Sequence, residues 1–384
     1  EWFRNGKPKQ ELVYKDNDVL LMNLWLETGE QIIKDGNGKF IMAYDNGKKK
    51  GEGYYKDGWI DGEWIFYTPS GEKDYKVTYV KGKKNGECIN WFKNGNIKSQ
   101  GPFVDDKKNG YWKWYREEGT LMMEGLLMNE IRTGTWVYWY TKGKKESVGN
   151  YKDDLQDSTW AFFYNTEAKW KFGNYSKGKK EGTWTTWFEN GQKLEEGSYV
   201  AGKEEGTWLS WYETGVMKNE GNFKAGKIHG SWKAWFPNNK PNYEGFFKNE
   251  LKDGAWKYYY DTGKIKEEGT YKEGKKDGHW IAWTPYGFKD SEGDYTQEHP
   301  NGLWVYYYQT GVKSMEQTFK DGKLSGDCKA WYENNTLKSV TSYTLIKDNK
   351  SGRVESKPHG KWIYYDKNGK TIMETTYSKG VKVN

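Results

Sequence analysis

The sequence predicts an all-β protein, an elongated and twisted antiparallel meander of about sixteen β-hairpin repeats, each 24 residues long. Three observations carry this prediction. Glycines recur at multiples of 24 residues, hairpin turn signals recur in phase with them, and aromatic residues dominate the apolar part of the chain. Self-similarity at a fixed period is typical of repeat proteins, in which each unit contacts only its neighbours.

The period is read from glycines that follow a pair of aromatic residues. They stand at Gly47, Gly71, Gly95, Gly119, Gly143, Gly191, Gly215, Gly263, Gly287 and Gly311. The skipped slots hold Glu167, Asn239 and Asn335, and Asn is the next best residue after Gly for left-handed backbone geometry. We therefore expect one continuous repeat domain in three parts. Irregular repeats occupy 1–46, the regular array occupies 47–335, and a repeat with a ten-residue insertion occupies 336–384.

Each unit reads as two strands joined by two turns. Counting the first Gly of the unit as position zero, Trp stands at position two and an aromatic residue at position five, as in Gly182, Trp184 and Trp187. The return strand reads Glu-Gly-x-Tyr, as at 196–199. Asn-Gly turns, as at 190–191, predict two-residue type I′ hairpin turns, and a looser turn rich in Lys and Gly closes the unit. Because side chains alternate along a strand, positions two and five should point to opposite faces.

The composition predicts a thin amphipathic sheet in place of a thick core. Hydrophobic residues make up only 35% of the chain, charged residues 30%, and the mean hydropathy is −1.10. With ordinary apolar residues these values would indicate disorder. Here aromatics make up 18%, with 23 Trp, 31 Tyr and 15 Phe, so most burial must come from rings. Forty-seven Gly and only eight Pro fit many tight turns between strands.

Charge and hydropathy exclude several classes of partner. The net charge of +7 comes from 61 basic and 54 acidic residues interleaved along the chain, whereas a nucleic-acid surface needs clustered Lys and Arg. No apolar stretch approaches the roughly 20 residues that cross a bilayer, so we expect no membrane span. The first residues fall inside a repeat, so we expect that the chain begins at a cut and that any export signal lies outside it. A cell-envelope or secreted location is favoured over a cytoplasmic one, and the location stays open.

One unit shows the whole repeat motif. It consists of Gly254, Trp256, Tyr258, Tyr259, Tyr260 and Gly263, followed by Glu268, Gly269, Tyr271, Gly274 and Gly278. This unit resembles the MORN-type repeat, in the Trp-rich bacterial variant found in YwqK-family antitoxins, and the resemblance covers nearly the entire chain. It implies a MORN-like solenoid or single-layer sheet that serves as a scaffold or binding surface, with toxin neutralisation in some members. Trp at position two departs from the eukaryotic MORN pattern, so phospholipid binding is not carried over.

The residue types that could support chemistry are scattered. Cys88 and Cys328 both replace Trp at position two and lie 240 residues apart, so we expect two buried, unpaired thiols that pack as small hydrophobes. The histidines lie in several different units, at His229, His279, His299 and His359. A metal needs three or four converging ligands, so we expect no metal or other cofactor. Carboxylate pairs recur at one repeat position, which argues against a catalytic pair, and we expect no catalytic residues and no enzyme.

Three functions follow, with the first preferred. The chain is predicted to be a non-catalytic scaffold that binds a protein partner along an extended surface. The alternatives are an antitoxin or immunity protein that neutralises a bacterial toxin, and an envelope glycan-binding protein whose exposed rings stack on sugars. Candidate partner-binding residues in the aromatic rows are Trp187, Trp211 and Trp235. Candidates for an acidic partner in the C-terminal insertion are Lys347, Lys350 and Arg353.

Overall fold

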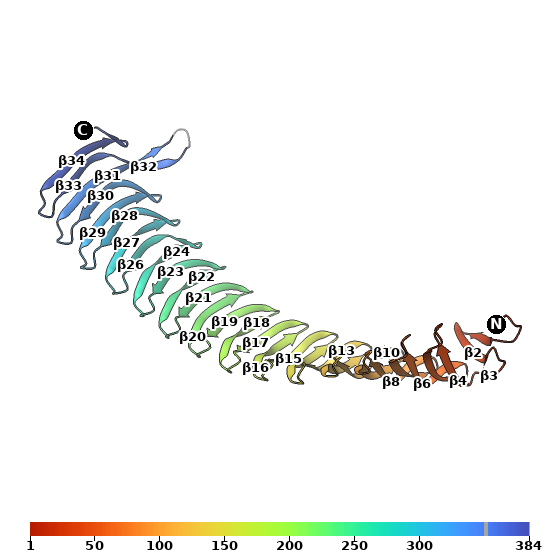
Figure 1. Cartoon of the computed structure of the whole chain (residues 1–384). Helices are drawn as coiled ribbons and strands as arrows, with labels where there is room; N and C mark the ends of the chain where they lie inside the picture. The colour runs from red at the N-terminus through yellow and green to blue at the C-terminus, as the bar shows by residue number, and fades with distance from the viewer. Residues whose placement is uncertain (349–351, 384) are drawn as a thin grey trace. The chain divides into compact units, whose positions relative to one another are not determined.

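The computed structural model describes residues 1–348 and 352–383. This part of the chain consists of strands and turns and contains no helix. It divides into two compact units, 1–191 and 192–384. Within each unit, successive strands lie side by side in chain order and pair antiparallel (Figure 1). The predicted all-β hairpin meander is therefore confirmed.

The first unit opens with a small sheet of β1 (Gln10–Lys15), β2 (Asp18–Trp25) and β3 (Gln31–Ile33). The meander then begins. Its strands here are β4 (Gly38–Ala43), β5 (Lys49–Lys56), β6 (Trp59–Tyr67), β7 (Lys73–Val80), β8 (Lys83–Trp91), β9 (Ile97–Val104), β10 (Lys107–Lys108), β11 (Gly110–Tyr115), β12 (Leu121–Met128), β13 (Ile131–Trp139), β14 (Lys145–Lys152), β15 (Leu155–Phe163), β16 (Lys169–Ser176) and β17 (Lys179–Trp187).

The second unit repeats the same pattern. Its strands are β18 (Lys193–Val200), β19 (Lys203–Trp211), β20 (Met217–Lys224), β21 (Lys227–Trp235), β22 (Pro241–Lys248), β23 (Leu251–Tyr259), β24 (Ile265–Lys272), β25 (Lys275–Lys276), β26 (Gly278–Trp283), β27 (Lys289–Thr296), β28 (His299–Tyr307), β29 (Lys313–Lys320), β30 (Lys323–Trp331), β31 (Leu337–Lys347), β32 (Val354–Pro358), β33 (Gly360–Tyr365), β34 (Thr371–Ser378) and β35 (Val381–Lys382). Among the described strands, β4 pairs along the ladder only with β5, and β35 only with β34, so the meander is open.

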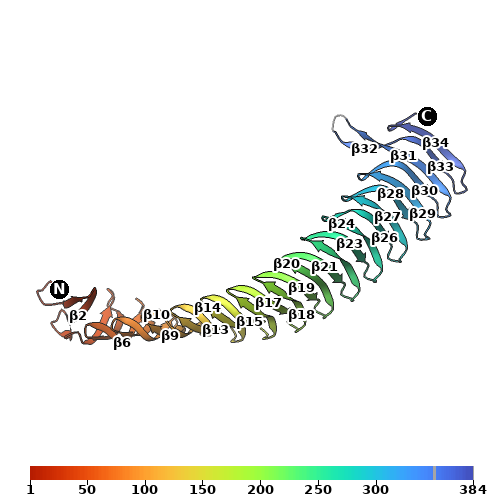
Figure 2. The same cartoon turned by 180° about the vertical axis from the view of Figure 1, so that it is seen from behind.

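The ten extra residues near the C-terminus lengthen one hairpin. Strand β31 pairs with β32 from Tyr343 opposite Pro358 to Lys347 opposite Val354. The hairpin extends beyond the neighbouring strands of its unit, as both views show (Figures 1 and 2). Strand β33 then pairs with β31, and the ladder resumes in register.

The two kinds of turn are the reverse of the prediction. At Asn46-Gly47 only Gly47 has a positive φ, and its N–H donates to the carbonyl of Tyr44 at 2.9 Å. This is a three-residue loop with a left-handed final residue. The two-residue turn with positive φ at both centres closes the unit, as at Lys81-Gly82. The prediction of type I′ geometry at Asn-Gly is therefore wrong.

The side chain of Asn46 explains why Asn is common at this turn. Its Oδ1 accepts a hydrogen bond from the N–H of Lys48 at 3.0 Å, and its Nδ2 donates to the carbonyl of Pro69 in the next repeat at 3.1 Å. Asn is thus used for its amide and not for positive φ. At the last residue of this loop, where most repeats have Gly, the predicted left-handed geometry is confirmed. Non-glycine residues with positive φ stand there at Glu167, Asn239 and Asn335.

One face of the meander, which we call the ladder face, carries the Trp at position two, the residue at position four and the return-strand Tyr. Trp64 stacks with Phe66 at a centroid distance of 5.9 Å, and Phe66 stacks with Tyr75 at 4.4 Å. The position-two rings form the core of the sheet. Those at most 2% exposed are Trp64, Trp112, Trp136, Trp160, Trp256 and Trp280.

The opposite face carries positions one, three and five. The Tyr67 hydroxyl at position five donates to Glu52 at 2.7 Å. The next residue, Gly53, lies beneath the Trp64 ring on the ladder face, so Glu52 belongs to the other side. This confirms that positions two and five point to opposite faces. Burial and the neighbouring Glu52 carboxylate raise the pKa of Tyr67 to about 12.

Candidate functional site

The ladder face carries a row of cations over its rings. They come from the residue two places before position zero, which shares this face because side chains alternate. The Lys108 amine lies 4.8 Å from the centre of the Trp112 ring, and the Arg132 guanidinium lies 4.1 Å from that of Tyr151. The same contact recurs for Lys84, Lys180, Lys252 and Lys276. Such cation–π contacts hold the charges at the sheet surface.

Lys252 shows how far these cations are drawn into the sheet. Its amine lies within 5.0 Å of the ring centres of Trp256, Tyr258 and Tyr271. It also donates to the Tyr258 hydroxyl at 2.6 Å. Burial lowers the pKa of Lys252 and raises that of Tyr258. A partly desolvated amine attracts an anion more strongly than one in open water.

The ladder of rings is interrupted once in the first unit. Ring contacts run from Phe40 to Tyr75 and resume between Phe103 and Trp112. Between these two stretches, Cys88 stands in place of the position-two Trp, and the residue at position four is Asn90 rather than an aromatic. No ring contact bridges this gap among the residues that the structure describes there.

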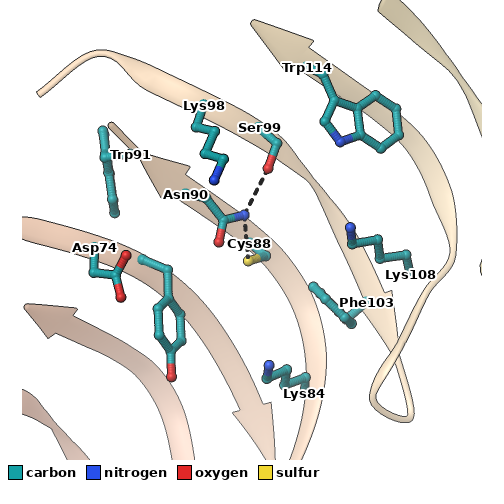
Figure 3. Close-up of a pocket in the computed structure, with 11 residues that line it drawn as sticks. Asp74, Lys84, Cys88, Asn90, Trp91, Lys98, Ser99, Phe103, Lys108 and Trp114 are labelled. Atoms are coloured by element: carbon teal, nitrogen blue, oxygen red, sulfur yellow. Dashed lines mark hydrogen bonds between the residues drawn. The ribbon is translucent and has the colours of Figure 1, made fainter. Parts of the chain in front are cut away.

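A cavity of about 470 Å³ lies in the gap (Figure 3). Cys88, Asn90 and Ser99 form its floor, where the Asn90 amide donates to the Ser99 hydroxyl at 2.9 Å and lies 3.7 Å from the Cys88 sulfur. Burial raises the pKa of the Cys88 thiol, and the nearby charges of Lys84 and Lys108 act in the opposite direction. The remaining lining residues are Asp74, Tyr75, Lys84, Trp91, Lys98, Phe103, Lys108 and Trp114. The cavity thus combines aromatic walls with three amines.

The predicted tryptophans at position five are half-buried on the face opposite the ladder. The carbonyl groups of Trp187 and Trp235 each accept a hydrogen bond from a turn tyrosine, at 2.8 and 2.9 Å. The Lys193 amine lies 5.6 Å from the Trp211 ring centre. Their backbone thus helps to hold adjacent repeats together. A role of these rings in partner binding stays a prediction.

Two of the three basic residues predicted in the insertion are exposed at the end of the long hairpin. Lys347 ends β31, and Arg353 immediately precedes β32. The N–H of Asp348 donates to the carbonyl of Arg353 at 2.8 Å, which closes the hairpin. Lys350 lies outside the described residues. The hairpin pairs Lys347 with Val354, next to Arg353 in the chain, and the role of Lys347 and Arg353 as partner contacts stays a prediction.

Both cysteines are buried, and neither is in a disulfide, as predicted. His279 lies 2.8 Å from Asp294 on an adjacent strand. Within the part of the chain that the structure describes, no group of three or more His, Cys, Asp or Glu side chains could hold a metal ion. The same residues include no helix long and apolar enough to span a membrane.

Comparison with solved structures finds distant likenesses. The TcdB2-TccC3 structure without its hypervariable C-terminal region shares 10% identity over 98% of this chain and 23% of its own, with a TM-score of 0.16. The Photorhabdus luminescens Tc holotoxin pore shares 11% over 98% and 23%, with a TM-score of 0.17. The TcdB2-TccC3-Cdc42 structure shares 8% over 97% and 29%, with a TM-score of 0.14. The chain thus spans less than a third of each. No curated protein sequence matches it.

A family description does match, repeatedly and across both units. The MORN repeat variant is found at residues 60–81, 84–105, 132–153, 180–201, 204–225, 228–249, 252–273, 292–321 and 358–379. Together these segments cover more than half of the chain, and most of them begin two residues before position zero. All of them except 292–321 are in phase with the rings and cations of the ladder face. The chain belongs to the MORN repeat variant family.

Proposed function

We propose that this protein is a non-catalytic repeat scaffold that binds a protein partner along the ladder face. One observation carries the proposal: cations lie over the aromatic rings of one face at the same place in repeat after repeat. Some rings at position four and on the return strand, such as Tyr258 and Tyr271, are only partly buried. Aromatic rings recurring on one surface are a residue type that protein interfaces favour, and the cations over them would supply electrostatic complementarity.

The chemistry of this face favours an extended, acidic partner segment. Carboxylates of the partner would approach amines such as those of Lys252 and Lys276, and its apolar side chains would pack on the rings between them. Electrostatic complementarity of this kind sets the orientation and speed of association more than its strength. Repetition every 24 residues lets one long segment use many weak contacts at once.

The test neutralises cations on one face at a time in the full chain. The ladder-face variant carries Lys252→Gln and Lys276→Gln, and its matched control carries Lys233→Gln and Lys329→Gln at exposed position-three sites on the other face. Proteins captured from the source organism's extract are compared quantitatively. We expect the ladder-face variant to capture at least about tenfold less of the partner than the wild type does. The control variant should capture as much as the wild type.

Two results would count against the proposal. Equal retention of the partner by the ladder-face variant would exclude this face. Retention of glycans without any protein, with quenching of Trp fluorescence by cell-wall fragments, would favour the glycan-binding alternative. The resemblance to YwqK-family antitoxins makes a toxin the narrower choice of partner. Co-expression with a toxin encoded beside this chain would then protect the cell, and a lack of protection would argue against that choice.

A further inference from the structure

We propose that the cavity at Cys88 is a binding site for a small aromatic carboxylate. This function is separate from the binding of a protein partner along the ladder face. Three observations support this proposal. They are the ring missing at Cys88, the three amines around the gap, and the contrast with the second position where Cys replaces Trp.

The cavity lies where the sheet elsewhere holds an indole ring. In the next repeat the equivalent residue, Trp112, is completely buried and packs edge-on against Phe103 at 5.4 Å. At Cys88 the ring is absent, while Tyr75 and Trp114 remain and line the cavity. A flat ring fits such a space because aromatic rings pack well in stacked or edge-on contact. The volume of about 470 Å³ lies within the usual range of small-molecule sites.

The rim of the cavity requires a negative charge on the ligand. Lys84 and Lys108 are half-buried, and among the described residues neither they nor Lys98 has a carboxylate partner within 4.0 Å. A carboxylate between these amines would accept charge-assisted hydrogen bonds. Asp74 also lines the cavity, and its charge disfavours a more highly charged anion such as phosphate. The Asn90 amide and Ser99 hydroxyl add polar groups at the floor.

The second replaced tryptophan lacks two of the three amines, and only Lys98 has a counterpart there, Lys338. At Cys328, the residues equivalent to Lys84 and Lys108 are Leu324 and Pro358. Both sites have thus lost a ring, but only the first has the half-buried pair of amines, Lys84 and Lys108. The proposal therefore assigns binding to the Cys88 cavity and none to the Cys328 site.

The experiment titrates the full chain with indole-3-propionate, which carries the missing ring and one carboxylate, by isothermal calorimetry. We expect saturable binding at one site per chain. Lys84→Gln and Lys108→Gln should each weaken it about tenfold, because each removes a charged hydrogen-bond donor. The double variant Val77→Gly, Cys88→Trp restores the usual glycine and tryptophan, fills the cavity and should abolish binding.

The matched control restores the same pair at the other site. Gln317→Gly with Cys328→Trp should leave indole-3-propionate binding unchanged. Absence of saturable binding to the wild-type chain would overturn the proposal, as would unchanged binding by the filled Cys88 variant or by both lysine variants. Acetate or inorganic phosphate binding as tightly as indole-3-propionate would also overturn it, because the aromatic walls would then contribute nothing.

Discussion

At the scale of single residues, the fold depends on a glycine that packs directly against the ring of the tryptophan in ten of the repeats. A Cβ added to Gly149 would lie 2.1 Å from Cδ2 of Trp160, and the Trp160 Nε1 donates to the carbonyl of Asn150 at 3.0 Å. The ring is thus fixed by contact below and by a hydrogen bond at its edge. The glycine precedes its tryptophan by 11 residues at Gly53, Gly101, Gly125, Gly149, Gly173, Gly197, Gly221, Gly245, Gly269 and Gly293.

Where the tryptophan is absent, the glycine is absent too. Val77 lies opposite Cys88, and Gln317 lies opposite Cys328. Val77 is completely buried, so a larger residue on one strand partly replaces the volume lost on the next. Swaps that conserve volume are the ones that packed interiors tolerate best. This pairing is visible in the sequence once the two motifs are compared at a separation of 11 residues.

We predict strong coupling between Gly149 and Trp160. Gly149→Val should destabilise the chain by about 1–3 kcal/mol through overpacking. Combined with Trp160→Cys, it should cost at least about 1 kcal/mol less than the sum of the two single changes. Denaturant unfolding followed by near-ultraviolet circular dichroism measures each variant. The control combines Gly149→Val with Trp112→Cys, three strands away, and its two changes in unfolding free energy should add. The prediction would be contradicted if the changes added for Gly149→Val with Trp160→Cys as well.

At the scale of elements, tyrosines at the three-residue turns tie each repeat to the next. The Tyr212 hydroxyl donates to the carbonyl of Trp235, 23 residues later, at 2.9 Å. Tyr332 reaches Tyr365 over 33 residues, so the insertion leaves this contact intact. Arg116 makes the equivalent bond to the carbonyl of Trp139. The same bond is made by Tyr44, Tyr140, Tyr164, Tyr260 and Tyr308.

This bond can be removed in one repeat and added in another. Tyr212→Phe should cost about 0.5–1.5 kcal/mol of local stability, the usual net worth of a neutral hydrogen bond. Phe236→Tyr should add a bond to the carbonyl of Tyr259 and slow hydrogen exchange at the turn that follows. Amide exchange by mass spectrometry reads both changes locally. Faster exchange in Phe236→Tyr, or no change in Tyr212→Phe, would show that the turns are held by other contacts.

The turns also show where the sequence was insufficient. Strand order and the alternation of faces follow from the period and from side-chain alternation, and both were predicted. Asn46-Gly47 matched the usual type I′ signal, yet the Asn amide bonds across to Pro69 of the next repeat. A turn whose geometry depends on a neighbouring repeat cannot be assigned from its own residues. The Cys88 cavity was missed for a related reason, since Lys84 and Lys108 come from adjacent repeats.

At the scale of the whole molecule, contacts run between consecutive strands and seldom farther. The free energy of unfolding is then approximately the sum of the stabilities of the individual repeats and of the interfaces between neighbouring repeats. The chain does not depend on one central core. The turn at 190–191 separates the two compact units, and each unit contains several complete hairpins. Apart from the one repeat that this turn divides, the hairpins of each unit are formed by its own strands.

We predict that fragments 1–191 and 192–384 each fold alone. Each should show strand-type far-ultraviolet dichroism and a near-ultraviolet signal from its packed rings. The full chain should unfold over a broad or stepped denaturant range, because linear arrays of this length lose two-state behaviour. Spectra of both fragments and a two-probe denaturation of the full chain provide the measurement. An unfolded fragment 192–384, or a single sharp transition for the full chain, would show long-range cooperativity that the contacts do not provide.

The glycine beneath each tryptophan belongs to one repeat, and the tryptophan belongs to the next. This restricts how such a gene can change length by recombination. Loss of residues 102–125 would bring Gly101 beneath Trp136 and preserve a proper pair. Loss of 78–101 would instead force Val77 against Trp112, where no space exists for its side chain. The repeats of this chain therefore share one shape but cannot be exchanged in any order, and we expect their number to change most easily away from boundaries such as that between Val77 and Cys88.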